Sequence, residues 1–150
     1  MIIALFGQPG SGKTTLAKEL LKQLPQAIHL DGDELRELFK DKDYSKDGRI
    51  NNLNRASFIA VVMQSKGYDV ILSLAYPYKE CRDYLNLHGE DVNLIYLHYD
   101  TNRDKKQFQI KDFEVPDEEK CLKFDTSFLK IDQCITLINL HLLSKKNKND

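Results

Sequence analysis

The feature that most constrains this chain is the run Gly-Gln-Pro-Gly-Ser-Gly-Lys-Thr at residues 7–14. It fits the pattern G-x-x-x-x-G-K-S/T of the phosphate-binding P-loop. The apolar residues 2–6 precede it and predict a buried strand. Residues 15–24 follow it with leucines at helical spacing, which predicts an amphipathic helix. This order of strand, glycine-rich loop and helix favours a nucleoside triphosphate site over a chance glycine-rich turn.

The residue types in the loop suit phosphate binding. Glycines let the backbone pass close to a phosphate without a Cβ clash, and the N–H groups at the start of a helix supply partial positive charge. We expect Lys13 to reach the β- and γ-phosphates of ATP, and the Thr14 hydroxyl to bind Mg²⁺. The residues predicted to bind the triphosphate are Gly7, Gly10, Ser11, Gly12, Lys13, Thr14 and Thr15.

Composition indicates one ordinary globular domain, residues 1–150, with a charged tail at 144–150 that we expect to fray. The 22 basic and 23 acidic residues give a net charge of −1, which predicts no nucleic-acid partner. No apolar run approaches the ~20 residues that cross a bilayer, so no membrane partner is expected. Three scattered cysteines and an N-terminus without a signal peptide predict a cytoplasmic protein.

The remaining sequence alternates expected strands with expected helices. This alternation predicts a three-layer α/β/α sandwich around a mainly parallel sheet. Ligands bind beyond the carboxyl ends of such strands, so the loops that contain Gly7, Asp31 and Ser73 should open at one edge. The expected strands after the first are 26–30, 70–74, 92–99 and 122–125, and the expected helices after the first are 34–40, 50–66, 78–86 and 127–143.

A triphosphate site is shared by kinases, GTPases, motor ATPases and nucleotide sensors. The base-reading N/T-K-x-D motif of a GTPase has its nearest match at 101–104, Thr-Asn-Arg-Asp, which lacks the lysine. A motor ATPase would carry an apolar strand that ends in acidic residues, whereas the strand at 70–74 ends in Ser73 and Leu74. Both classes are therefore disfavoured.

The Asp31-Gly32-Asp33 run favours a small-molecule kinase. Phosphoryl transfer needs an acceptor hydroxyl held in line, a carboxylate near it and cations on the transferring group. Asp31 is predicted to end the strand beside the P-loop, where a carboxylate is well placed for the acceptor. The alternative is a simple turn in which Asp33 caps the next helix, and Asp33 could do both.

Basic and aromatic residues follow in or beside the next two helices. Arginine suits an anionic acceptor because its planar fork binds phosphate or sulfate oxygens in pairs, although each arginine alone could belong to a solvated helix face. Tyr44 could stack on a nucleobase or could be a surface aromatic that closes the core. The polar residues of this group are Arg36, Arg49, Asn52 and Arg55.

Taken together, these residues resemble the adenylylsulfate kinase family, and the resemblance covers nearly the whole chain. The matching motifs are the P-loop at 7–14, Leu-Asp-Gly-Asp-x-Leu-Arg at 30–36, Tyr44-Ser45 with Arg49, Asn52 and Arg55, the strand at 70–73 with Pro77, Tyr78 and Arg82, Phe-Glu-x-Pro at 113–116, and Asp-Thr at 125–126.

The resemblance implies that the protein transfers the γ-phosphate of ATP to the ribose 3′-hydroxyl of a nucleotide, adenylylsulfate above all, with Mg²⁺. It implies that Lys13 handles the phosphates, that Asp31 is the general base, and that Asp33 orders acceptor and metal. It also suggests a homodimer. The residues implied to bind the acceptor nucleotide are Asp33, Arg36, Tyr44, Arg49, Asn52 and Ser73.

The chain departs from the family at the lid, where residues 100–112 replace a longer segment that carries a lysine and the second aromatic of the base site. Lys105, Lys106 or Lys111 could replace the lysine, and Phe108 the aromatic. Two alternatives therefore stay open. One is a related kinase that acts on another nucleotide, such as cytidine diphosphoramidate in capsule modification. The other is a catalytically weak P-loop module that binds nucleotide.

Overall fold

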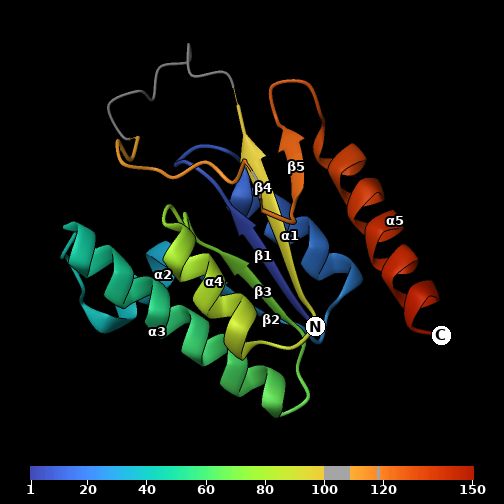
Figure 1. The fold of residues 1–150 in the computed structure, drawn as a ribbon, viewed down its shortest axis with the longest axis horizontal. Helices are drawn as coiled ribbons and strands as arrows, with labels where there is room; N and C mark the ends of the chain where they lie inside the picture. The colour runs from blue at the N-terminus through green and yellow to red at the C-terminus, as the bar shows by residue number, and fades with distance from the viewer. Residues whose placement is uncertain (100–108, 118) are drawn as a thin grey trace.

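The computed structural model describes residues 1–99, 109–117 and 119–150. Strands and helices alternate along these residues (Figure 1). No helix in this part of the chain is long and apolar enough to span a bilayer. The strands are β1 Ile2–Phe6, β2 Ile28–Asp31, β3 Val70–Ser73, β4 Val92–His98 and β5 Leu122–Asp125, and the helices are α1 Lys13–Gln23, α2 Gly32–Phe39, α3 Lys46–Ser65, α4 Lys79–His88 and α5 Ile131–Asn149.

The strands form one sheet in the order β2-β3-β1-β4-β5, and every neighbouring pair is parallel. Leu5 of β1 pairs with Ser73 of β3, and Ser73 pairs in turn with Asp31 of β2. The three strands therefore end side by side, and the loops after them open at one edge of the sheet. This confirms the predicted α/β fold and places the P-loop between the ends of β3 and β4.

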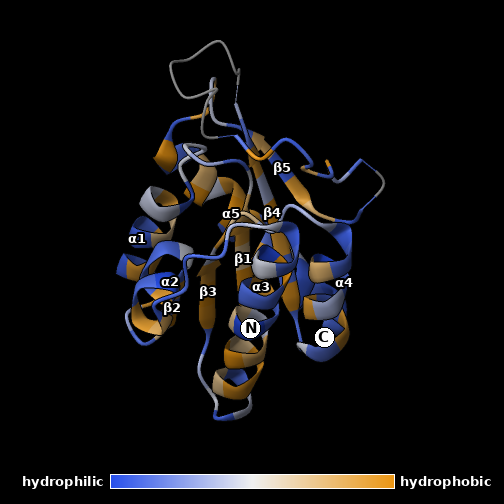
Figure 2. Cartoon of the chain, turned by 90° about the vertical axis from the view of Figure 1, so that its left-hand side faces the viewer, coloured by the Kyte–Doolittle hydropathy of each residue, from blue (hydrophilic) through white to orange (hydrophobic). Residues whose placement is uncertain are grey.

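Side chains alternate across β1 between two hydrophobic clusters. Ile2, Ala4 and Phe6 pack with residues of α2, α3 and α4, whereas Ile3 and Leu5 pack with residues of α1 and α5. The two helical layers lie on opposite faces of the sheet, with α5 at the right in Figure 1 and α3 and α4 in front at the left. Figure 2 shows the apolar strands enclosed between helices whose surfaces mix hydrophilic and hydrophobic residues.

Three helices, α1, α2 and α3, begin earlier than the sequence predicts, and side chains cap the N-termini of α2 and α3. Ser45 accepts a hydrogen bond from the backbone N–H of Gly48 at 3.1 Å, so α3 begins at Lys46 and not at residue 50. Asp31 caps α2 by accepting from the N–H of Asp33 at 3.1 Å. The expected cap at Asp33 is therefore wrong, because Asp33 already lies inside the first turn.

The last helix runs later in the chain than predicted. α5 begins at Ile131 and continues to Asn149, so the tail expected to fray from Ser144 is helical. Within it, Lys145 Nζ donates hydrogen bonds of 2.7 Å to Asp91 Oδ1 and to Asn93 Oδ1, which ties this part of α5 to the start of β4. Composition alone did not show this tertiary contact.

Candidate active site

The P-loop presents its backbone to the edge of the sheet. Gly7 has φ +150°, and a Cβ there would collide with the carbonyl oxygen of Leu97 on β4. Gly12, the N-cap of α1, has φ +95°, which an L side chain rarely adopts. No side chain caps α1, and its first turn holds no acidic residue. The N–H groups at the start of α1 are therefore left for an anion.

Lys13 lies over the loop that it follows. Its Nζ donates hydrogen bonds of 2.9 Å to the carbonyl oxygens of Gly7 and Gln8. Burial lowers the pKa of Lys13 from 10.5 to about 8, although Asp31 and Asp33 act in the opposite direction. The ammonium is therefore poorly hydrated, and a phosphate group would relieve that cost.

Asp31 is buried and fully engaged. Its Oδ1 accepts hydrogen bonds from Thr14 Oγ1 at 2.8 Å and from Ser73 Oγ at 2.7 Å, and its Oδ2 accepts from the N–H of Asp33. Burial raises the pKa of Asp31, but the hydrogen bonds from Ser73 and Thr14 outweigh it and hold the pKa below its ordinary value. Asp31 is therefore a stable anion beside the Thr14 hydroxyl. This pair of oxygen donors suits Mg²⁺.

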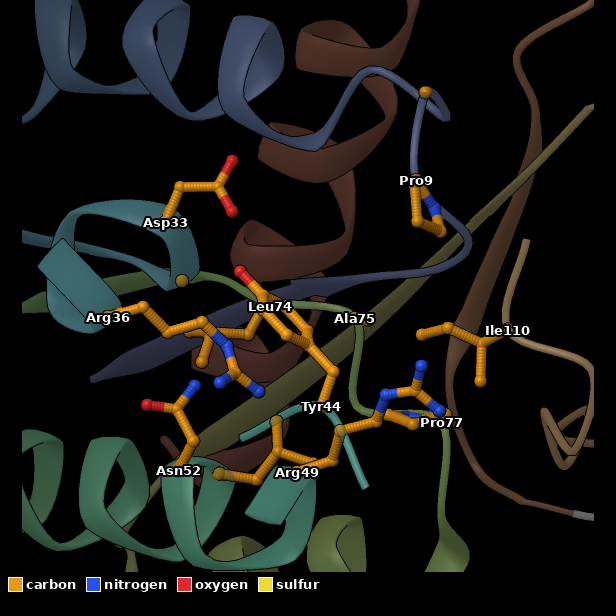
Figure 3. Close-up of a pocket in the computed structure, with 13 residues that line it drawn as sticks. Pro9, Asp33, Arg36, Tyr44, Arg49, Asn52, Leu74, Ala75, Pro77 and Ile110 are labelled. Carbon is orange, nitrogen blue, oxygen red and sulfur yellow. The ribbon is translucent and has the colours of Figure 1, made fainter. Parts of the chain in front are cut away.

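Asp33 has a different environment. Its side chain is exposed, and no hydrogen bond from the described residues reaches its carboxylate. Asp33 lines two adjoining pockets, one of about 400 Å³ over the P-loop and one of about 550 Å³ toward α3. Among the described residues that line both pockets, Asp33 is the only one with an ionisable side chain (Figure 3).

The larger pocket brings together residues that the sequence analysis assigned to acceptor binding and that are far apart in the sequence. Arg36 comes from α2, Tyr44 from the loop after it, and Arg49 and Asn52 from the first two turns of α3 (Figure 3). Pro77 and Ile110 complete the opposite side. The pocket therefore has a cationic wall beside an aromatic ring and an apolar wall.

Arg36 and Tyr44 hold each other in place. The Arg36 guanidinium lies over the Tyr44 ring, 4.2 Å from its centroid, and Arg36 Nη1 donates to the carbonyl oxygen of Asp43 at 3.0 Å. Tyr44 is 60% exposed. The alternative that Tyr44 closes the core is therefore wrong, and its ring is accessible beside the pocket.

On the α3 side of the pocket, one buried oxygen has no partner and one arginine has an acidic neighbour. The side-chain oxygen of Asn52 is buried without a hydrogen-bond partner in the described part of the chain. An unpaired buried oxygen of this kind costs about 1–3 kcal/mol, so a ligand donor would be favoured there. Arg49 Nη1 lies 3.7 Å from Asp112 Oδ1, and the Tyr78 hydroxyl donates to Asp112 Oδ2 at 3.0 Å.

Several predicted residues have other positions. Arg55 lies outside both pockets, over the Phe39 ring and 3.7 Å from an oxygen of Asp41. Lys111 lines neither pocket and faces a separate pocket beside β4. Ser73 lines the P-loop pocket, but its hydroxyl is bound to Asp31. The candidates Lys105, Lys106 and Phe108 lie outside the described residues.

Two site residues were not predicted from the sequence. The Gln8 amide pairs with the backbone of Ile110 in both directions, at 2.9 Å and 2.8 Å, and so ties residues 109–112 to the P-loop. His29 Nε2 lies 2.8 Å from Ser73 Oγ. Gln8 occupies a variable position of the P-loop motif, and His29 lies in an apolar strand. No local sequence pattern therefore indicated that either residue belongs to the site.

Comparison with known proteins gives these residues a family. A model of adenylylsulphate kinase matches residues 1–112. The chain is 36% identical over 104 residues to the "Probable adenylyl-sulfate kinase" of Pseudomonas aeruginosa, which covers 66% of this chain and 48% of that protein. It is 36% identical over 119 residues to the cytidine diphosphoramidate kinase of Campylobacter jejuni, which covers 73% and 69%. The chain spans about half the length of its adenylyl-sulfate kinase relatives.

Solved structures agree on the fold. The Mycobacterium tuberculosis APS kinase CysC in complex with AMPPNP and APS superposes with a TM-score of 0.78 at 22% identity, over 95% of this chain and 96% of that chain. At this identity the likeness concerns the fold alone. The family model, the identity to the Campylobacter jejuni relative and the shared fold all agree, and the chain belongs to the adenylylsulphate kinase family.

Proposed function

We propose that this protein is an ATP-dependent kinase that transfers the γ-phosphate to the ribose 3′-hydroxyl of a nucleotide, with Mg²⁺. Adenylylsulfate is the first candidate acceptor, because the family and most of its named relatives point to it. The observation that carries the proposal is the position of Asp33, an exposed carboxylate between the P-loop pocket and a pocket lined by arginines.

The donor side follows from the P-loop. The loop backbone and the start of α1 bind the phosphates of ATP, and Lys13 neutralises charge on the γ-phosphate. Thr14 and Asp31 would hold Mg²⁺, which would balance the charge of the phosphates when it is bound. Ser73 keeps Asp31 in place through its hydroxyl.

The proton of the acceptor hydroxyl is better assigned to Asp33 than to Asp31. The family resemblance implies Asp31 as the general base, but Asp31 accepts three hydrogen bonds and its pKa is lowered. Both features make it a weak base. Asp33 lines both pockets, and its oxygens accept no hydrogen bond from the described residues. It can therefore reach the hydroxyl of an acceptor nucleotide where the two pockets meet.

The acceptor nucleotide would lie in the larger pocket. Arg36 and Arg49 supply positive charge for its acidic groups, and Asn52 has an unpaired oxygen for a donor on the ligand. Tyr44 offers a ring face to the base, which is worth about 1–3 kcal/mol of stacking.

A second acceptor, cytidine diphosphoramidate, is favoured by one observation. In the sequence comparison, the Campylobacter jejuni cytidine diphosphoramidate kinase is matched over 69% of its length, whereas the Pseudomonas aeruginosa adenylyl-sulfate kinase is matched over 48%. The catalytic residues would be the same, and only the base and the terminal group would differ. A homodimer and a cytoplasmic location stay predictions. The three cysteines form no disulfide with one another.

An acceptor screen tests the proposal. The protein, ATP and Mg²⁺ are incubated with adenylylsulfate or with cytidine diphosphoramidate, ADP release is followed, and ³¹P NMR locates the new phosphate. Lys13→Ala is the control for background hydrolysis. We expect ADP release that depends on one of these acceptors and a phosphate on its 3′-oxygen. ADP release that no nucleotide acceptor stimulates would favour a weak nucleotide-binding module instead.

A further inference from the structure

His29 has no part in the proposed function, yet it lies at the end of a chain of hydrogen bonds that reaches the P-loop. His29 belongs to β2, and Ser73 ends the neighbouring strand β3. His29 Nε2 lies 2.8 Å from Ser73 Oγ, Ser73 Oγ donates to Asp31 Oδ1 at 2.7 Å, and Thr14 Oγ1 donates to the same oxygen at 2.8 Å. Four side chains from α1, β2 and β3 are therefore connected in series.

The protons in this series have one consistent arrangement. A hydroxyl carries one proton, and the Ser73 proton points to the Asp31 anion, which has none to return. Ser73 Oγ must therefore accept from His29, and the proton of the imidazole must lie on Nε2. A neutral ring with its proton on Nε2 has no proton on Nδ1.

The direction of the series decides what the Thr14 hydroxyl can do. Because its proton points to Asp31, its oxygen lone pairs remain for a cation. Hydrogen bonds in series polarise one another, so the His29 donor strengthens the bond from Ser73 to Asp31. A side chain that only accepted hydrogen bonds at position 29 would instead compete with Asp31 for the Ser73 proton.

We propose that His29 is a positioning residue that acts through Ser73 and Asp31 to orient the Thr14 hydroxyl for Mg²⁺–ATP. This inference rests on the proposed function for its ligand, but it concerns nucleotide binding and not transfer. Binding measurements therefore test it separately from the choice of acceptor.

The first experiment observes the tautomer directly. Long-range ¹H–¹⁵N NMR spectra of the free protein at pH 7.5 distinguish a neutral imidazole protonated on Nε2 from one protonated on Nδ1. His29→Gln identifies the His29 signals by their loss. We expect the Nε2–H tautomer, and its loss or a changed shift in Ser73→Ala. A neutral His29 protonated on Nδ1 would overturn the inference.

The second experiment is a double-mutant cycle. Calorimetry measures AMPPNP affinity with and without Mg²⁺ for the wild type, His29→Leu, Ser73→Ala and the double variant. We expect His29→Leu to reduce the gain in affinity that Mg²⁺ provides by roughly 3- to 10-fold, the scale of one lost hydrogen bond, and to leave Mg²⁺-free binding unchanged. The double variant should match Ser73→Ala, because His29 acts through Ser73.

Three further variants sharpen the cycle. His29→Gln keeps an N–H donor and should restore most of the affinity, whereas His29→Glu should lose at least as much as His29→Leu. His88→Leu is the control, because His88 is exposed at the far end of α4. Additive losses of affinity in the double variant, or losses of the same size without Mg²⁺, would overturn the inference about His29. Neither result would overturn the proposed function. A wild type that fails to bind AMPPNP would overturn the proposed function as well.

Discussion

Two aspartates separated by one glycine have opposite environments in this protein. Asp31 is buried and receives three hydrogen bonds, whereas Asp33 is exposed and faces two pockets. The difference arises because Asp31 ends a strand and caps a helix, while Asp33 lies on the first turn of that helix. In the proposed reaction, Asp31 would therefore serve as a fixed anion and Asp33 as the base.

Separate substitutions should divide these roles. We expect Asp33→Asn to slow transfer by roughly 10²–10⁴, the usual scale for a general base, and to leave the affinity for Mg²⁺–AMPPNP nearly unchanged. Asp31→Asn should reduce that affinity, because Thr14 loses its anionic partner. Calorimetry and single-turnover kinetics measure the two effects. Full transfer rates in Asp33→Asn would remove Asp33 from the role of base.

Lys13 should make ATP binding depend on pH. Its pKa of about 8 in the free protein means that roughly half of the ammonium groups are neutral at pH 8. Phosphate favours the charged form, so binding should take up about half a proton at pH 8 and about a tenth at pH 7. Affinity should fall as pH rises above 8. Calorimetry in buffers of different ionisation enthalpy measures the uptake. Lys13→Arg, which stays charged, should show no uptake from this position.

At the scale of elements, the site depends on how the segment 109–112 meets the P-loop. The Gln8 amide binds the N–H and the carbonyl of Ile110, and the Tyr99 hydroxyl donates to the Pro9 carbonyl at 2.7 Å. Asp112, in the same segment, lies beside Arg49, which lines the larger pocket. A movement of the P-loop on binding phosphate would therefore also move residues 109–112.

Gln8→Leu should loosen that connection. Two hydrogen bonds of about 0.5–1.5 kcal/mol each are lost, so the amide of Ile110 should exchange its hydrogen roughly tenfold faster or more, while amides of β1 keep their rates. Gln8→Glu, which keeps only the acceptor, should give an intermediate rate. Hydrogen exchange followed by mass spectrometry or NMR measures this. An unchanged rate at Ile110 would show that other contacts hold the segment.

At the scale of the whole molecule, one buried arginine of α4 connects the loop after β3 to the segment that precedes β5. Arg82 is fully buried on α4 and forms two hydrogen bonds with Glu119, at 2.8 Å and 2.6 Å. It also donates to the carbonyl oxygens of Tyr76 and Glu114. Residues from two loops 30 or more positions apart in the chain are thereby fixed to one side chain.

Arg82→Met should lower the free energy of unfolding by about 3–5 kcal/mol, because it leaves Glu119, only 11% exposed, without its cation. Arg82→Met combined with Glu119→Gln should cost less than Arg82→Met alone. Urea denaturation followed by circular dichroism measures both. A loss below about 1 kcal/mol in Arg82→Met would mean that water replaces the arginine.

Most of the fold was predictable from the sequence, because strands, helices and the P-loop are encoded by local patterns. The apolar run at 2–6 and the glycines at 7–12 require no distant partner to be recognised. The parallel order then placed Asp31 and Ser73 at the edge where the P-loop opens. Helix boundaries were less predictable, since Ser45 and Asp31 set two of them by capping.

The sequence by itself therefore determined the fold, the phosphate site and the edge at which ligands meet. Only the tertiary structure decided the roles within that edge. His29 meets Ser73 across 44 residues, and Gln8 meets Ile110 across 102. Such partners depend on strand register and loop placement, which no local pattern contains. For the same reason, the sequence did not show that Asp31 is buried and caps α2 while Asp33 is exposed on its first turn.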